Sequence, residues 1–261
     1  MEIKNHILSA KNLSIGYTSK KKKTVISSNL NLELHRGELV CLLGKNGIGK
    51  STLLRTLTKV QQKISGEIRL QGQILESYTS NELAKQMSIV LTEKIPQSNL
   101  TVYELIALGR QPYTNWLGTL TMEDKNQIRL ALDHTGLGDL LHKRSDELSD
   151  GQLQRVMICR ALAQNTDIII LDEPTAHLDI QHKIETFQLL KDLAHQLNKS
   201  ILISSHEIQL ALQMGDVLWL MNEREILSGK PKTLIENNKI NLLFDTDAIY
   251  FDKEKSQFLI K

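Results

Sequence analysis

The sequence predicts an α/β fold, with a mostly parallel sheet covered by helices, an N-terminal antiparallel β subdomain and an inserted helical subdomain. Two observations support this fold class. The runs ELVCLLG (38–44) and DIIILDE (167–173) have the continuous apolar character of strands buried inside a parallel sheet. Each run is followed by a polar loop and then by a helical segment, and strands that alternate with helices favour a parallel sheet.

The first strands precede that core. Segments 7–18 and 25–38 alternate apolar and polar residues, and the lysine run 20–23 between them is expected at the solvated tip of a hairpin. After ELVCLLG come a glycine loop and the helical segment KSTLLRTLTKV (50–60), and then a short strand region at 66–75. We therefore expect an antiparallel unit beside the first strand–loop–helix unit of the core.

The second half of the chain continues the alternation. The strand MSIVL (87–91) leads into a mostly helical stretch, from which we expect a helical subdomain at about 94–163. After DIIILDE, the segment 182–197 has apolar residues at helical spacing. Three further elements are expected: strands at 200–205 and 216–222 and a terminal hairpin at about 245–261. No repeat or linker interrupts the pattern, so we expect one domain over residues 1–261.

Composition excludes several classes of function. The 261 residues carry 32 basic and 30 acidic side chains, and a net charge of +2 gives no reason to expect a nucleic-acid partner. No apolar stretch approaches the ~20 residues of a membrane helix, so we expect a cytosolic protein. The two cysteines, Cys41 and Cys159, lie in apolar surroundings and are expected to be buried thiols. His177 and His182 are interpreted as ordinary surface or loop residues.

The strongest local motif is GKNGIGKST, which matches the phosphate-loop pattern of Gly, four residues, Gly, Lys and Ser or Thr. It stands between a predicted strand and a predicted helix, so its backbone N–H groups and the helix N-terminus can surround phosphate oxygens. Lys50 should reach the β- and γ-phosphates, and Ser51 should offer its hydroxyl to Mg²⁺. The residues expected to bind the nucleotide here are Gly44, Lys45, Asn46, Gly47, Ile48, Gly49, Lys50, Ser51 and Thr52.

A second motif, IIILDEPT (168–175), carries two carboxylates at the C-terminal end of a buried strand. Ligands of open α/β sheets bind at that edge. Asp172 is placed to hold Mg²⁺, and Glu173 is placed to polarise the attacking water as a catalytic base. After a phosphate loop, this pair predicts a nucleoside triphosphatase of the P-loop class.

The segment ELSDGQLQRVMICRALAQ narrows that class. Ser149 and Gly151 stand at the predicted start of a long helix, and with the two motifs above the segment resembles the signature of the ATP-binding cassette family. Asp150 replaces a glycine of the common form LSGGQ. The resemblance covers nearly the whole chain and implies ATP and Mg²⁺ as cofactors and ATP hydrolysis as the activity.

The resemblance also implies roles for single residues. Tyr17 matches the family's aromatic residue that stacks on adenine, Asp179 its D-loop, and His206 its switch histidine at the γ-phosphate. In this family two cassettes close head to tail, so a homodimer is implied. Each copy would act on the partner's ATP through Ser149, Gly151 and Gln152. It would act on its own ATP through Lys50, Ser51, Asp172, Glu173 and His206.

The stretch LTVYELIALGRQPYTNW and the later LDIQHKIE resemble cassettes of importers for iron chelates, haem and cobalamin, where GR-x-P and LDI-x-H are frequent. This implies separate integral-membrane permease subunits, an external substrate-binding protein, and a location at the cytoplasmic face of the membrane. Two alternatives remain open: a soluble cassette ATPase of translation or DNA repair, and a transporter subunit for other cargo.

One position departs from the family. Most cassettes have a magnesium-contacting glutamine after the strand that corresponds to MSIVL (87–91), whereas SIVLTEKIPQ offers both Glu93 and Gln97. The short step from strand to loop favours Glu93 as this residue and as a third metal ligand, with Gln97 as the alternative.

Overall fold

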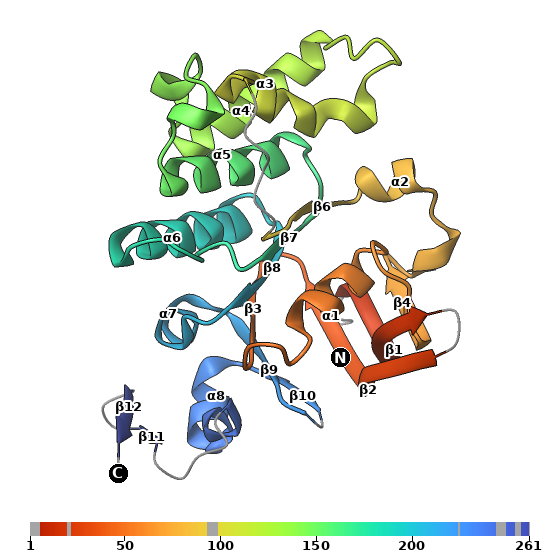
Figure 1. Ribbon diagram of the computed structural model, residues 1–261, viewed down its shortest axis with the longest axis vertical. Helices are drawn as coiled ribbons and strands as arrows, with labels where there is room; N and C mark the ends of the chain where they lie inside the picture. The colour runs from red at the N-terminus through yellow and green to blue at the C-terminus, as the bar shows by residue number, and fades with distance from the viewer. Residues whose placement is uncertain are drawn as a thin grey trace.

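The computed structural model describes residues 6–19, 22–92, 99–223, 225–243, 249–253 and 257–260. Within them the chain forms one six-stranded sheet, one four-stranded sheet and one two-stranded sheet. The α/β fold class predicted from the sequence is confirmed, including the N-terminal antiparallel subdomain and the helical subdomain (Figure 1).

The six-stranded sheet is the core of the molecule, and its strand order is β10-β9-β3-β8-β7-β6. Its strands are β3 (Leu39–Leu43), β6 (Met87–Val90), β7 (Ile168–Asp172), β8 (Ser200–Ser205), β9 (Val217–Met221) and β10 (Ile226–Gly229). All neighbours pair in parallel except β9 and β10. Because β3, β8 and β7 are adjacent, the loops that follow them meet at one edge of the sheet. The antiparallel edge strand β10 was not predicted from the sequence.

The antiparallel subdomain is a four-stranded sheet in the order β2-β1-β4-β5. Its strands are β1 (His6–Ser19), β2 (Lys22–His35), β4 (Ser65–Leu70) and β5 (Gln73–Ile74). The 3-10 helix η1 (Leu75–Ser77) and helix α2 (Ser80–Ala84) lead from it back to the core. Figure 1 shows this unit on the same side of the core sheet as helix α1 (Lys50–Leu57).

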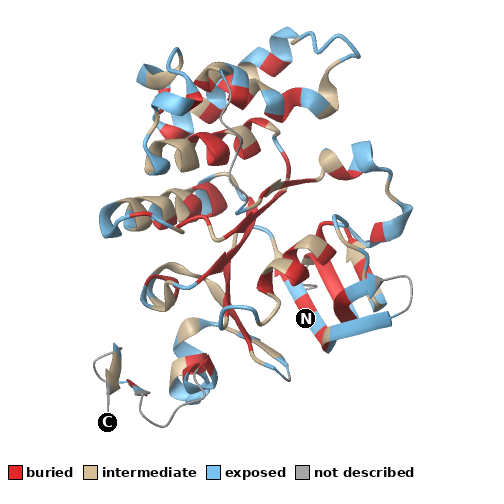
Figure 2. Ribbon diagram, in the orientation of Figure 1, coloured by how far each residue is buried: buried red, intermediate tan, exposed pale blue. Residues whose placement is uncertain are grey.

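The alternation of side chains along β3 assigns each covering layer to one face of the core sheet. Leu39, Cys41 and Leu43 belong to an apolar cluster with the helices of the other side, whereas Val40 and Leu42 pack with the β subdomain and α1. Both faces are therefore covered, and the central strands are the most continuously buried part of the molecule (Figure 2). Cys41 and Cys159 are buried free thiols, as expected.

The helical subdomain, which includes α5, lies at one end of the core sheet (Figure 1). Its elements are α3 (Val102–Ala107), η2 (Leu108–Tyr113), α4 (Met122–Thr135), η3 (Gly138–Leu140), η4 (Ser145–Glu147) and α5 (Asp150–Ala163). Helix η2 approaches α5 closely, because a Cβ on Gly109 would lie 2.3 Å from the carbonyl oxygen of Arg160. The next residue, Arg110, donates from Nη1 to the carbonyl oxygen of Ala163 at 2.9 Å. The Gly-Arg pair of the GR-x-P stretch thus packs the subdomain together.

The remaining elements follow the core strands: α6 (Ile180–Gln196), α7 (Ile208–Met214), α8 (Pro231–Glu236), η5 (Lys239–Leu243), β11 (Ile249–Asp252) and β12 (Gln257–Ile260). Strands β11 and β12 pair antiparallel with each other. In the part of the chain that the structure describes, no helix combines the length and the apolar character needed to span a membrane.

Candidate active site

The loop between β3 and α1 has the conformation that its glycines permit. Gly47 and Gly49 have φ angles of 76° and 113°, in the left-handed region that favours glycine. A Cβ on Gly49 would lie 2.6 Å from Cγ2 of Ile26, and a Cβ on Gly44 would lie 2.6 Å from the carbonyl oxygen of Met221. The loop therefore fits only with glycine at these places, and Gly49 caps the N-terminus of α1.

Lys50, the first residue of α1, lies inside this loop with 4% of its surface exposed. Its Nζ donates to the carbonyl oxygens of Gly44 at 2.8 Å and Lys45 at 3.1 Å. Burial lowers the pKa of the ammonium group, and the nearby carboxylates of Glu173 and Asp172 oppose that effect. The loop and the lysine thus form one unit that presents a positive charge at the helix N-terminus.

Asp172 and Glu173 follow at the end of β7. Asp172 is 4% exposed, and its Oδ1 accepts a 2.6 Å hydrogen bond from Oγ of Ser204. The same Ser204 Oγ accepts a 2.9 Å bond from the backbone N–H of Glu173. Thr92 donates from Oγ1 to the carbonyl oxygen of Asp172 at 2.9 Å. Glu173 has φ 52°, a left-handed conformation that is strained for this residue and that these bonds maintain.

His206 connects the lysine and the glutamate. Its Nε2 lies 2.6 Å from Oε1 of Glu173 and 3.3 Å from Nζ of Lys50. One ring nitrogen cannot donate and accept at once, and the carboxylate and the ammonium need opposite roles from it. The shorter contact assigns a proton to Nε2, which donates to Glu173. The other two residues expected to act in catalysis, Glu173 and Lys50, thus both lie within direct contact distance of His206.

Tyr17 reaches the same site from β1. Its hydroxyl lies 3.0 Å from Oγ1 of Thr52 in α1, and the residue is 56% exposed. The ring is therefore held beside the phosphate loop with much of its surface open to a ligand.

The signature segment lies on a different element. Ser149 is the N-cap of α5: its Oγ accepts from the N–H of Gln152 at 3.2 Å, and Oε1 of Gln152 accepts from the N–H of Ser149 at 3.1 Å. Ser149 and Asp150 are exposed. Gly151 packs against the ring of His182, a surface residue in the first turn of α6 whose side chain is 42% exposed.

A cleft separates the first turns of α5 from the carboxylates. Its lining includes Asp150 and Leu153 from α5, Asp172 and Glu173 from the end of β7, and Thr92. Thr92 is the last described residue before the gap at 93–98. Glu93 and Gln97, the two candidates for the magnesium-contacting position, therefore lie outside the described residues.

Two residues of this site were not anticipated from the sequence, Ser204 and Thr92. For Ser204 the signal was present, because it opens the SSHE motif and pairs with Asp172 in the register of β7 and β8. For Thr92 no pattern in the sequence indicated a bond to a residue 80 positions away.

We expect Ser204→Ala to lower ATP hydrolysis by ~10-fold and the free energy of unfolding by about 1–3 kcal/mol, because it leaves a buried carboxylate and an N–H group without their shared partner. Ser200→Ala is the matched control, since Ser200 is in the same strand but donates from Oγ to the carbonyl oxygen of His35 at 2.7 Å. Phosphate release and urea unfolding of both variants would measure this. Equal hydrolysis rates for the two variants would contradict a role for Ser204 at the carboxylates.

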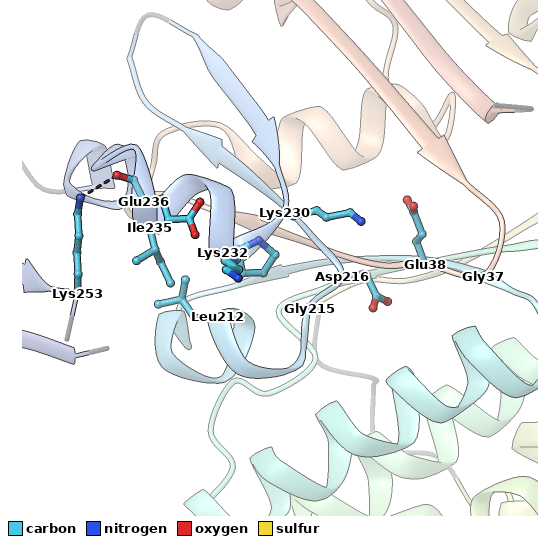
Figure 3. A pocket seen from close by; sticks show the side chains of 11 residues that line it. Gly37, Glu38, Leu212, Gly215, Asp216, Lys230, Lys232, Ile235, Glu236 and Lys253 are labelled. Carbon is cyan, nitrogen blue, oxygen red and sulfur yellow. Dashed lines mark hydrogen bonds between the residues drawn. The ribbon is translucent and has the colours of Figure 1, made fainter. Parts of the chain in front are cut away.

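A second pocket does not belong to this site. It is lined by residues of α7, α8 and the turn before β3, among them Glu38, Asp216 and Lys230 (Figure 3). Glu38 and Asp216 directly precede β3 and β9, so the pocket lies at the N-terminal ends of the parallel strands. The residues predicted to bind the nucleotide lie at the opposite, carboxyl-terminal edge.

A parallel sheet that gathers a phosphate loop, two carboxylates and a histidine at its carboxyl edge defines a P-loop nucleoside triphosphatase. The sequence model of the ABC transporter family matches residues 27–176. This chain belongs to the ABC transporter family, and the resemblance inferred from its motifs is confirmed.

Two relatives are similar over almost their whole length. An uncharacterized ABC transporter ATP-binding protein of Methanocaldococcus jannaschii is 38% identical over 256 residues, which cover 98% of this chain and 87% of that protein. The petrobactin import ATP-binding protein YclP of Bacillus subtilis is 37% identical, over 92% of this chain and 93% of its own.

Two solved structures have the same fold. An inward-facing, putative metal-chelate type ABC transporter matches with a TM-score of 0.79 and 26% identity, over 98% of this chain and 96% of that chain. A dimeric ATP-binding cassette in a post-hydrolysis state, bound to ADP and Pi, matches with a TM-score of 0.72 and 28% identity, over 86% and 98%. This chain is accordingly an ATP-binding subunit that hydrolyses ATP.

Proposed function

We propose that this chain is the ATPase subunit of an importer for iron chelates, with a ferric siderophore as the first candidate cargo and haem or cobalamin as the others. The observation that carries the proposal is the 37% identity to a petrobactin import ATP-binding protein over nearly the full length of both chains. The GR-x-P and LDI-x-H stretches that suggested this group lie inside that similarity. The match of this chain to an import ATP-binding protein over nearly the full length of both disfavours a soluble ATPase of translation or DNA repair.

In the proposed mechanism, the phosphate loop and Lys50 bind the β- and γ-phosphates of ATP. Ser51, Asp172 and Glu93 would hold Mg²⁺, which neutralises charge on the phosphate oxygens. The oxygen-donor set fits this ion, and the bond from Ser204 Oγ fixes the carboxylate of Asp172. Glu173 accepts the proton of the attacking water. His206, whose Nε2 lies beside both Glu173 and Lys50, contacts the γ-phosphate.

Two copies of the chain are proposed to close head to tail around two ATP molecules. Ser149 and Asp150 are exposed at the N-terminus of α5, on the helical subdomain. From there Ser149, Gly151 and Gln152 would contact the γ-phosphate held by the partner copy. Hydrolysis then removes the group that joins the two copies, and the dimer opens.

Separate permease subunits would receive this motion. A groove between the helical subdomain and the core is lined by Thr58, Lys59 and Val60 after α1, by Leu83 of α2, and by Arg160 of α5 and Gln164 directly after it. Its apolar and cationic lining suits an amphipathic segment of a permease at the cytoplasmic face of the membrane. An external binding protein would deliver the cargo.

The proposal is tested by reconstituting the chain with its permease in lipid vesicles. Binding proteins loaded with a ferric siderophore, haem or cobalamin are added from outside, and ATP hydrolysis is measured. We expect the ferric siderophore complex to stimulate hydrolysis by ~10-fold over the unloaded protein. Stimulation by haem or cobalamin alone would change the cargo, and no stimulation by any of the three would overturn the importer assignment.

A further inference from the structure

His182, the third residue of helix α6, is bonded to the residue that caps the helix. Asp179 is its N-cap, and Oδ1 accepts a hydrogen bond from the N–H of His182 at 2.9 Å. The ring Nδ1 of His182 lies 2.9 Å from Oδ1 and 2.8 Å from Oδ2 of Asp179. The backbone and side-chain bonds from His182 lower the pKa of Asp179, so the carboxylate is ionised and only accepts. Nδ1 therefore carries a proton, and the ring has one orientation.

The oriented ring contacts the signature segment. A Cβ on Gly151 would lie 3.0 Å from Cδ2 and 3.2 Å from Cγ of His182, so the imidazole fills the space where a side chain at 151 would start. Gly151 is the second residue of α5, two residues after Ser149. The backbone of the signature segment thus rests on a residue three positions after the D-loop aspartate of the same chain.

A second contact lies one turn further along both helices. Arg155 of α5 and Glu185 of α6 form an ion pair of 2.6 Å between Nη2 and Oε2. Both side chains are more than a third exposed, and exposed pairs of this kind contribute little. The side chains of His182 and Asp179 are themselves 42% and 64% exposed, so what sets the imidazole ring apart from the ion pair is its packing on the backbone at Gly151.

The same turn of α6 reaches the switch segment. Lys183, next to His182, donates from Nζ to Oε1 of Glu207 at 2.6 Å, and Glu207 directly follows His206. Adjacent residues of one helical turn thus contact the two segments that serve different ATP molecules in the proposed dimer. The signature acts on the partner's nucleotide, and His206 acts on the chain's own.

We propose that His182 is a positioning residue that sets the place of Gly151 relative to Asp179 and to the switch segment. A shift of His206 when its own γ-phosphate arrives or leaves would pass through α6 and the imidazole ring to the signature that holds the partner's ATP. Each site would then sense the state of the other from within one chain. The inference rests on the proposed head-to-tail dimer.

Three variants of His182 separate the role of the ring from that of its hydrogen bond to Asp179. Each is made in a Glu173→Gln parent, which binds ATP but hydrolyses it slowly. His182→Ala removes both features, His182→Asn keeps a donor to Asp179 without the ring, and His182→Phe keeps a ring without the donor. Gln188→Ala is the matched control, because Gln188 is exposed on the same helix and donates to Asp192, away from α5. The dimer dissociation constant with ATP is measured by analytical ultracentrifugation.

We expect His182→Ala and His182→Asn to raise the dimer dissociation constant by ~10-fold, His182→Phe to raise it less because its ring remains but is no longer bonded to Asp179, and Gln188→Ala to leave it near that of the parent. Binding of a fluorescent ATP analogue by the single chain, and the melting temperature, should stay close to the parent in all four. A merely structural histidine would instead change these two readouts first.

The outcomes distinguish the inference from the proposed function. A parent that forms no dimer with ATP overturns the head-to-tail proposal and the inference with it. A parent that dimerises, with His182→Ala and His182→Asn dimerising equally well, overturns the inference alone. Loss of single-chain ATP binding together with the dimer would overturn it too, since the effect would then lie in the chain's own site.

Discussion

Glu173→Gln is expected to lower steady-state ATP hydrolysis by ~10²–10⁴-fold while ATP binding remains. The substitution keeps the size of the side chain, and its amide oxygen can still accept the bond that Nε2 of His206 donates at 2.6 Å. The amide lacks the basicity to take a proton from the attacking water. Phosphate release at saturating ATP gives the rate, and titration with a fluorescent ATP analogue gives the affinity.

The control variant, Glu123→Gln, makes the same change of carboxylate to amide away from the site. Glu123 is exposed on α4 and accepts a bond from Gln127 of the same helix, so Glu123→Gln should hydrolyse ATP at the wild-type rate. If Glu173→Gln kept a rate near that of the wild type, Glu173 would not be the base. If it lost both turnover and ATP affinity, the carboxylate would have a structural task at the end of β7 instead.

The parts of the site that could be predicted from the sequence are those whose chemistry is local. A phosphate loop needs glycines and a lysine within a few residues, so the segment from Gly44 to Thr52 can be recognised from the sequence without knowledge of the fold. Asp172 ends one short apolar run, and His206 follows another. Because ligands bind at the carboxyl edge of a parallel sheet, the two residues are predicted to lie close together. In the structure the strands concerned, β3, β8 and β7, are adjacent.

The parts that could not be predicted depend on contacts between distant segments. Ser204 bonds Asp172 because strands β7 and β8 pair in one register, and a shift by one residue would turn its hydroxyl to the other face. His182 is the histidine of the LDI-x-H stretch, but nothing in the sequence indicated its contact with Gly151, 31 positions earlier. The GR-x-P stretch was interpreted as a mark of a transporter group, whereas its glycine and arginine are explained by packing on α5.

That packing predicts the largest effect on stability. Arg110→Ala should lower the free energy of unfolding by ~3–5 kcal/mol, because it leaves the buried carboxylate of Asp124 without its counter-charge. The two side chains are 4% and 2% exposed, and Nε of Arg110 lies 2.9 Å from Oδ1 of Asp124. Urea unfolding measures the change. Arg129→Ala, which removes a 3.7 Å pair with Asp133 on the exposed face of α4, should change it by less than ~1 kcal/mol.

The loss should depend on pH in a direction that the charges fix. Burial alone would raise the pKa of Asp124, but bonds from Thr121 and Arg110 outweigh it and hold the pKa below its usual 3.8. When the folded-state pKa of a carboxyl group is lowered, the group contributes stability that is fully present above its unfolded-state pKa. That contribution is lost as the pH falls through the folded-state pKa. Without Arg110 the bonds from Thr121 remain but oppose burial alone, so the pKa of Asp124 should rise and acid should destabilise the variant less than the wild type. The gap in unfolding free energy should therefore be widest near pH 7 and narrow towards pH 4, and a gap independent of pH would mean that lost packing, not the unpaired charge, destabilises the variant.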